Sequence, residues 1–296
     1  MKKNLLVLMA LALASGVLWA GESVDVTKST SATPMVEIEN LAGSVKITGW
    51  DQNEVKVTGI LGDDTEGLDF SGSGDSVEIE VEIPDSYGRR HRDLDADLEI
   101  WVPVGSSLDV ETVSASIRVV GVNGSLELES VSGEVEVDGS PTSADVETVS
   151  GNIEISGSQT RVIAESVSGR IELSGVAERV DAATVSGSVE ISASNIERGE
   201  IEAVSGSVRF TGALSSGARL SAESHSGSVV LNLPADTSAR FQIETFSGSI
   251  NNEFGGGEAE RTSRYAPGKR LDFTLGSGDA QVSVESFSGS VTLRQQ

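Results

Sequence analysis

Apolar and polar residues alternate through most of this chain, and the alternation is organised into short phrases that recur from Leu108 onward. A typical phrase reads VETVSGNIEI, with an apolar residue four positions before a central Ser and a β-branched residue three positions after it. The central Ser stands at positions 114, 132, 150, 168, 186, 205, 226, 247 and 288. Intervals of 18 residues between the first five copies, followed by longer ones, are typical of a stacked repeat architecture.

Each phrase predicts two short β-strands, because the residues on both sides of the Ser alternate with a period of two rather than 3.6. One strand pair cannot bury its apolar face alone, so we expect equivalent residues to stack about 4.8 Å apart in parallel ladders. The pattern therefore predicts an all-β fold, a parallel β-solenoid (β-helix) with about 18 residues per coil. Parallel crossovers are mostly right-handed, which favours a right-handed coil over the left-handed alternative.

Two glycine columns indicate the corners of the coil. Gly follows the central Ser in eight of nine phrases, with Ala115 as the exception. We interpret this glycine as a residue with positive φ, which glycine adopts without a steric penalty. A second column marks another corner at Gly121, Gly139, Gly157, Gly175 and Gly212, with Ala193 in its line.

The N-terminal segment predicts export. Residues 1–20 combine Lys2 and Lys3 with an apolar run that ends at Ala20. This pattern is typical of a Sec signal peptide cleaved after Ala20, and the run is too short for a spanning helix. The mature protein is expected in the periplasm, at the cell surface or outside the cell. Residues 21–35 are polar and unpatterned, so a flexible lead-in is expected there.

The remainder is predicted to contain a cap and a solenoid. Residues 36–107 begin with a phrase that matches the later repeats, with Ala42 in place of the Ser, and continue into irregular strands and loops expected to cap the stack. The interval from Ala42 to Ser114 is 72 residues, four times 18, which leaves open whether diverged coils lie between them. Residues 108–296 are expected to form the β-solenoid repeats, with a loop insertion near 253–270.

The charge restricts the possible partners. Without the predicted leader the chain has 19 basic and 46 acidic residues, a formal charge of −27. We therefore expect no direct binding to nucleic acid or to an anionic membrane surface. The sequence contains no Cys, so stability has to come from packing rather than disulfides. A second long apolar run is not found, so no transmembrane segment is expected in the mature chain.

The predicted leader, the strand Leu98–Pro103 ending in Val-Pro, and the tandem VETVSG phrases together resemble the DUF4097 family of bacterial putative adhesins. The resemblance covers most of residues 36–294, and it is specific because the phrase repeats. It implies a β-solenoid in the bacterial envelope or outside it. It implies little chemistry, because fold alone does not define function.

Two columns of Glu are the first candidate site. One stands three residues before the central Ser, is interrupted by Ala183, and consists of Glu111, Glu129, Glu147, Glu165, Glu202, Glu223, Glu244 and Glu285. The second outward column holds Glu136, Glu154, Glu172 and Glu190. Like charges at this spacing repel by about 1 kcal/mol even in water, so the ladders could weakly bind divalent cations. The favoured alternative is a solvated acidic face that keeps rods from associating at their edges. No other cofactor is expected.

A column of apolar residues immediately precedes the central Ser. Its members are Val113, Val131, Val149, Val167, Val185, Val204, His225, Phe246 and Phe287. Strict alternation would place the column outside, as an apolar stripe suited to a partner. The favoured alternative is that the chain bends at the preceding Thr or Ser and turns the column inward. His225 belongs to this column, so we interpret it as a repeat position rather than a catalytic histidine.

Two smaller clusters lie in the predicted cap. Asp93, Asp95 and Asp97 have the first spacing of a calcium loop, but the required Gly and Glu at its sixth and twelfth positions are replaced by Leu and Val. An outward strand stripe is therefore expected. Residues 89–92 (Arg-Arg-His-Arg) are the only basic cluster. We interpret them as a solvated loop rather than a site for an anionic glycan or lipid headgroup.

Catalysis is not expected. Two His and no Cys leave few possible nucleophile–base pairs, and no G-x-S-x-G elbow is present. A polysaccharide-acting β-helix enzyme is the enzymatic alternative, but it would need aromatic platforms, and only 4% of the residues are aromatic.

The leading hypothesis is a non-enzymatic exported scaffold, an adhesin or surface-binding protein. Its partner would be an envelope or extracellular macromolecule. A periplasmic module that senses envelope stress or regulates a response is the alternative, and a self-associating rod is the third possibility.

Overall fold

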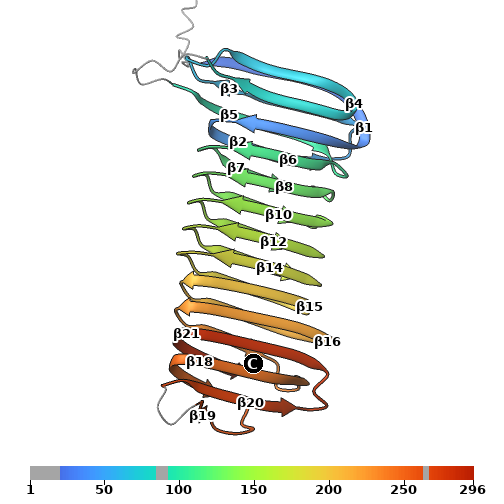
Figure 1. Cartoon of the computed structure of the whole chain (residues 1–296). Coiled ribbons are helices and arrows are strands. Elements are labelled where there is room, and N and C mark those ends of the chain that lie inside the picture. Colours follow the sequence, from blue (N-terminus) through green and yellow to red (C-terminus); the bar gives the residue numbers. More distant parts are fainter. Residues whose placement is uncertain (1–20, 85–92, 263–266) are drawn as a thin grey trace, which may run out of the picture.

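The computed structural model describes residues 21–84, 93–262 and 267–296. These residues form an elongated all-β rod in which 21 strands join one sheet system with mostly parallel pairing (Figure 1). The described ranges contain no helix, and so none that could cross a membrane. The predicted all-β architecture of stacked parallel strands is confirmed.

The middle of the rod consists of two ladders of strands. The first ladder contains β6 (Ser107–Thr112), β8 (Ser125–Ser130), β10 (Ser143–Thr148), β12 (Arg161–Ser166) and β14 (Arg179–Thr184). The second contains β7 (Ser116–Val120), β9 (Val135–Gly139), β11 (Ile153–Gly157) and β13 (Ile171–Val176). β15 (Val189–Ser205) and β16 (Val208–Ser226) are long strands that take part in both ladders.

Equivalent residues of successive phrases pair directly. Val146 pairs with Leu128 on one side and Ala164 on the other, and Ile153 pairs with Ile171. These partners are 18 residues apart, as the repeat period predicts. The inward Val, Ile, Leu and Ala side chains are buried, so they stack into one continuous core along the rod. The right-handed twist of the coil stays a prediction.

The N-terminal coil is covered by an outer layer. β1 (Glu22–Asn40) and β2 (Ala42–Trp50) stack in register on β6 and β7. The outer layer consists of β3 (Glu54–Leu61), β4 (Gly67–Glu82) and β5 (Asp95–Pro103). β4 pairs with β1 and β5 with β2 in parallel, while β3 runs antiparallel to both β1 and β5. The 72-residue interval therefore contains no coil between the first phrase and β6, because Ser44 pairs directly with Ser116.

The first part of β1 corrects the expectation of a flexible lead-in over residues 21–35. Residues 22–29 pair antiparallel with β3, and Val24 and Val26 pack against the core. The backbone hydrogen bonds of this pairing do not depend on side-chain type, so two apolar residues are enough to orient the strand. The many Ser and Thr side chains made the segment look unpatterned.

The C-terminal end has the same design. It contains β17 (Val229–Leu233), β18 (Ala239–Asn252), β19 (Glu260–Arg261), β20 (Lys269–Leu275) and β21 (Ala280–Gln295). The last strand, β21, lies between β16–β17 and β18, and β18 then pairs antiparallel with β20 (Figure 1). The C-terminus of the chain therefore lies inside the stack, between β17 and β18, whereas residues 22–29 at the N-terminal end lie on the outside, paired with β3 alone. The segment predicted as a loop near 253–270 contains β19, which pairs with β20.

The glycine after the central Ser is needed for a reason other than the predicted one. Gly151 and Gly169 do not have positive φ, so the positive-φ interpretation of this column is wrong. A Cβ atom on Gly169 would instead lie 1.8 Å from the carbonyl oxygen of Gly151 in the neighbouring coil. Positive φ occurs in the second column, where Gly121, Gly157 and Gly175 have values of 69°, 113° and 88°. Close stacking of the coils thus requires glycine in the first column. In the second column, the backbone conformation favours glycine at these three positions.

Candidate functional site

The apolar column before the central Ser faces solvent, which corrects the expectation that it turns inward. Val149 and Val167 are 47% and 45% exposed, and Phe287 is 48% exposed. The residue before each member is buried, and it is a Thr or Ser in every case except Ala203, so the strand alternation continues up to the corner. We call this surface the apolar stripe; in spatial order it contains Val113, Val131, Val149, Val167, Val185, Val204, His225, Phe287 and Phe246.

The stripe ends in a stack of aromatic rings. The ring of His225 lies 4.7 Å from that of Phe287, and the ring of Phe287 lies 4.8 Å from that of Phe246, with interplanar angles of 5° in both pairs. These separations equal the spacing of neighbouring strands, so stacking follows directly from the ladder. The order His225–Phe287–Phe246 exists because β21 lies between β16 and β18.

Buried hydroxyl groups hold the corner from which the stripe projects. Thr148 Oγ1 donates to Ser166 Oγ over 3.1 Å, and Ser166 Oγ accepts a hydrogen bond from the N–H of Gly169 over 2.8 Å. Thr112 and Ser130 form the same pair over 2.9 Å. The hydroxyls satisfy backbone groups that the tight turn would otherwise leave buried and unpaired. They are structural and lie beneath the stripe.

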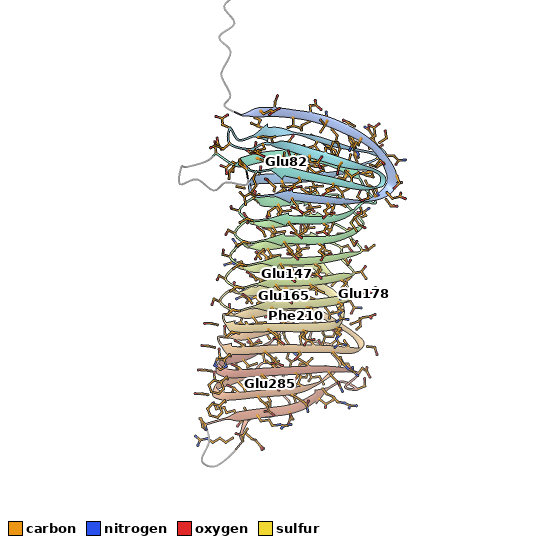
Figure 2. All side chains as sticks on the ribbon, turned by 45° about the horizontal axis from the view of Figure 1, so that its top comes forward. Glu82, Glu147, Glu165, Glu178, Phe210 and Glu285 are labelled. Atoms are coloured by element: carbon orange, nitrogen blue, oxygen red, sulfur yellow. The ribbon has the colours of Figure 1, made fainter. Side chains whose placement is uncertain are left out.

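The predicted Glu column lies beside the stripe as one ladder. All eight predicted residues belong to it, in the spatial order Glu111, Glu129, Glu147, Glu165, Glu202, Glu223, Glu285 and Glu244, with Ala183 interrupting the line. Figure 2 labels Glu147, Glu165 and Glu285, which lie along one line of the rod. The ladder also extends past the predicted members to Glu39 and Glu80, because β1 and β4 pair in the same register.

Partial burial and mutual repulsion raise the pKa of several carboxyl groups in this ladder. The residues with a raised pKa are Glu39, Glu129, Glu165 and Glu223. In each case burial is the larger cause and the charges of nearby carboxylates add to it; Glu147 contributes to both of its neighbours. The folded protein therefore holds protons on the ladder more tightly than an isolated Glu would.

Arg270 closes the C-terminal end of the Glu ladder. Its Nη1 atom lies 2.9 Å from Oε1 of Glu244, and its Nε atom donates to Asp272 over 2.6 Å. Within the described ranges, no group of three or more His, Asp or Glu side chains is arranged to hold a metal ion. Weak collection of divalent cations along the ladder stays a prediction.

A groove runs along the rod between the apolar stripe and the Glu ladder. Its longer part has a volume of about 670 Å³ and extends from the region of Glu39 to Val204. A second part of about 590 Å³ continues from Glu202 to Phe287. One wall is apolar, the other carries carboxylates, and the buried Thr and Ser residues form the floor. This geometry suits an elongated partner that presents both apolar and basic groups.

The second predicted Glu column lies on the other ladder of strands. It contains Glu136, Glu154, Glu172 and Glu190 in register. An arginine closes each end: Arg118 pairs with Glu136, and Nη1 of Arg209 lies 3.2 Å from Oε1 of Glu190. These exposed ion pairs contribute little to stability, but they compensate the charges at both ends.

The smaller clusters lie apart from the groove-forming repeats. Asp93, Asp95 and Asp97 are exposed, as expected for an outward stripe at β5, and Ser44 Oγ donates to Asp97 Oδ1 over 2.6 Å. Residues 89–92, the predicted basic cluster, lie outside the described residues.

The first ladder of strands also carries a column of arginines that single segments of the sequence do not reveal. Its members are Arg161, Arg179, Arg198, Arg219 and Arg240. Residues 89–92 are therefore not the only basic cluster of the chain. Each of the five stands seven residues before a central Ser, so alignment on the Ser reveals the column. A search for neighbouring basic residues does not, because consecutive members are 18 to 21 residues apart.

The fold and its surface columns define an all-β protein of stacked, solenoid-like repeats. The chain belongs to the Toastrack DUF4097 family, whose model matches residues 20–294. The family resemblance seen in the repeat phrases is thereby confirmed. No match was found among the curated proteins.

Three solved structures illustrate what this chain is similar to. A putative adhesin from Bacteroides fragilis NCTC 9343 is 11% identical, with a TM-score of 0.45 over 92% of this chain and 97% of that one. A putative lipid binding protein from Parabacteroides distasonis ATCC 8503 is 13% identical, with a TM-score of 0.42 over 93% and 96%. A putative cell adhesion protein from Clostridium sporogenes ATCC 15579 is 9% identical, with a TM-score of 0.24 over 93% and 100%.

Proposed function

We propose that this chain is a non-enzymatic surface scaffold, an adhesin-like protein that binds an elongated macromolecule in the groove. The apolar stripe carries this proposal. Its side chains are about half exposed on consecutive coils, and the stripe forms one line over the length of the repeat array. The buried core is complete without them, and a contiguous exposed apolar surface is typical of an interaction site.

The acidic wall of the groove restricts the partner. A ligand that covers the stripe also comes next to the Glu ladder, so it has to bring basic groups as well as apolar ones. A protein of the envelope or of another cell's surface can present both, whereas nucleic acid and anionic lipid would be repelled. The proposal includes export by the predicted signal peptide at residues 1–20 to the periplasm, the cell surface or the medium.

Beads coated with residues 21–296 and applied to intact cells of the producing organism test this function. Flow cytometry measures whether binding is saturable. In the test variant, Val131→Asn, Val149→Asn and Val167→Asn remove three neighbouring members of the stripe. If the partner covers these side chains, each loses roughly 1 kcal/mol of apolar contact, and the affinity falls roughly a hundredfold.

The matched control places the same three Asn residues on the other ladder, as Glu136→Asn, Glu154→Asn and Glu172→Asn. All six positions face outward, so both variants are expected to fold, which equal thermal stability verifies. Binding that falls in the stripe variant and persists in the control supports the proposal. Saturable binding that is equal in the two variants excludes the groove, and a lack of saturable binding excludes the adhesin-like function.

A further inference from the structure

A line of arginines runs along the face of the rod that also carries the Glu ladder. It has one residue on each successive strand, which we call a rung. In spatial order the rungs are Arg161, Arg179, Arg198, Arg219, Gln281 and Arg240, so Gln281 is the one rung that is not an arginine. Neighbouring strands lie about 4.8 Å apart, so the line is about 24 Å long. We call it the Arg ladder. It is the counterpart of the Glu ladder on a chain whose net charge is strongly negative.

The described structure gives these arginines no ion pair. None of the salt bridges within 4.0 Å in the described ranges involves a member of the Arg ladder. Four of the five are exposed, and Arg179 is half-buried. Like charges stacked at this distance repel one another even in water, so the fold gains no stability from the arrangement. We therefore look for the role of the Arg ladder in the binding of a partner rather than in the stability of the fold.

The next outward column on this face changes character along the rod. Two residues after each rung it reads Ile163, Asp181, Glu200, Ser221, Ser283 and Gln242. The carboxylates beside the first rungs can offset their charge. From Ser221 to Gln242 the column is neutral, so Arg219 and Arg240 have no acidic residue beside them in their own strands. The next residue of the column, Asp272 of β20, pairs with Gln242 and accepts a hydrogen bond from Arg270.

The Glu ladder is too distant to compensate these rungs. Its members stand four residues further along each strand, which is about 13 Å from the Arg ladder and beyond the screening length of about 8 Å in physiological salt. Glu244 is already paired with Arg270. The uncompensated positive charge is thus confined to the C-terminal half of the Arg ladder.

A depression of about 470 Å³ lies over these same rungs. Its polar lining consists of Arg198, Arg219, Arg240, Gln242, Gln281, Glu200, Ser221 and Ser283. Guanidinium groups bind carboxylate and sulfate groups through two parallel hydrogen bonds. Amides and hydroxyls both donate and accept, as is needed to match the hydroxyl groups of a sugar.

We propose that this depression binds a linear anionic polysaccharide, whose sugars carry carboxylate or sulfate groups. The Arg rungs at regular spacing match repeated negative groups, and the Gln and Ser side chains between and beside them match the neutral hydroxyls. This site is separate from the groove, so it stands or falls independently of the proposed adhesin-like function.

Two other occupants fit the same surface less well. Single-stranded nucleic acid is usually held by aromatic side chains that stack on its bases, and the lining contains none. A second copy of this chain could place its Glu ladder against the Arg ladder. The column between the two ladders would then face itself, which brings Asp181 and Glu200 against their own counterparts.

Binding to immobilised polysaccharides tests the proposal. The probes are alginate, which carries carboxylates, dextran sulfate, which carries sulfates, and uncharged dextran; oligo(dT) represents single-stranded nucleic acid. The test variant combines Arg198→Gln, Arg219→Gln and Arg240→Gln. The control combines Arg118→Gln, Arg209→Gln and Arg294→Gln, which removes the same charge from exposed arginines outside the depression.

The expected result is saturable binding to alginate or dextran sulfate but not to dextran. The test variant should lose affinity by about tenfold or more, while the control stays within about twofold of the unchanged protein. Comparison of alginate with dextran sulfate distinguishes carboxylate from sulfate recognition. Both variants are compared only after their melting temperatures are shown to agree.

Four outcomes overturn the proposal. These are no binding to either charged polysaccharide, equal losses in the two variants, oligo(dT) binding as tight as polysaccharide binding, and dimerisation in solution that the test variant abolishes. Equal losses of affinity would mean that binding depends only on the net charge of the protein. Dimerisation would identify a second copy of the chain as the occupant of the depression.

Discussion

Replacing Gly169 by Ala is predicted to force two neighbouring coils apart. A Cβ atom at this position would lie 1.8 Å from the carbonyl oxygen of Gly151 and 2.8 Å from Oγ of Ser166. Real Cβ contacts essentially never fall below 3.0 Å, so the neighbouring backbone has to move by more than an ångström. No flexible side chain can absorb this displacement, because the closest contact is with backbone.

The cost can be worked out from the hydrogen bonds at this corner. The N–H of Ser168 donates to the carbonyl of Val149 over 2.9 Å, and the N–H of Gly169 donates to Ser166 Oγ over 2.8 Å. Losing both costs about 2 kcal/mol, and the overpacking costs about 1–3 kcal/mol more. The free energy of unfolding is therefore expected to fall by about 3–5 kcal/mol.

Gly121→Ala is the matched comparison. Gly121 has a φ of 69°, but its added Cβ would meet nothing within 4 Å, so only conformational strain opposes the substitution. That strain costs about 1–2 kcal/mol. Denaturant unfolding followed by circular dichroism measures both variants, and hydrogen exchange locates the coils that open, since stacked repeats need not unfold in two states. Equal losses in the two variants would refute the close-contact explanation.

Two further predictions concern the Glu ladder. The raised pKa values of Glu39, Glu129, Glu165 and Glu223 mean that these carboxyl groups bind protons more tightly in the folded state than in the unfolded state. The stability gained from this proton binding is complete below the ordinary pKa of 4.5, and it is lost as the pH rises through the raised pKa values. The melting temperature should therefore increase as the pH falls from neutral toward about 5, and a decrease in thermal melts would contradict this assignment. The hypothesis of cation collection predicts that millimolar Ca²⁺ raises the melting temperature above its value at matched monovalent ionic strength, because carboxylate oxygens bind this cation, whereas the favoured solvated acidic face predicts no difference. Identical melting temperatures would exclude cation collection by the ladder.

The repeat period was sufficient to predict which residues lie side by side in the middle of the rod. Ile153 stacks on Ile171 and Glu147 on Glu165, because the inward apolar side chains fix the register of each strand and the outward residues follow. Family membership and the all-β class could be predicted for the same reason.

The order of the coils at the ends could not be predicted from the repeats. Ser226 pairs with Ser288 rather than with Ser247, the next repeat along the chain. Similar coils offer one another nearly the same surface, so an insertion of β21 between β16 and β18 leaves no mark in the periodicity. The 72-residue interval before Ser114 was ambiguous for a related reason, since an outer layer and a set of diverged coils have the same length.

The apolar stripe was assigned to the wrong side because burial of a hydroxyl was underestimated. Polarity alone places Ser166 outside and Val167 inside. In the structure Ser166 is buried, and its Oγ accepts the N–H of Gly169 and the hydroxyl proton of Thr148, which compensates the loss of water. The bend then comes after Val167 instead of before it, so the valine is exposed.

Stacking explains why binding surfaces of this protein take the form of lines. A residue placed once per coil becomes a row with a spacing of about 4.8 Å, whether it is apolar, acidic or basic. Inward rows are constrained by packing, whereas outward rows are free to vary. The chemical character of the surface therefore changes where the residue type changes along a row. The column beside the Arg ladder changes from Glu200 to Ser221, and Gln281 interrupts the arginines. These changes of residue type along a row, rather than the repeats themselves, set the limits of each surface that can bind one partner in preference to another.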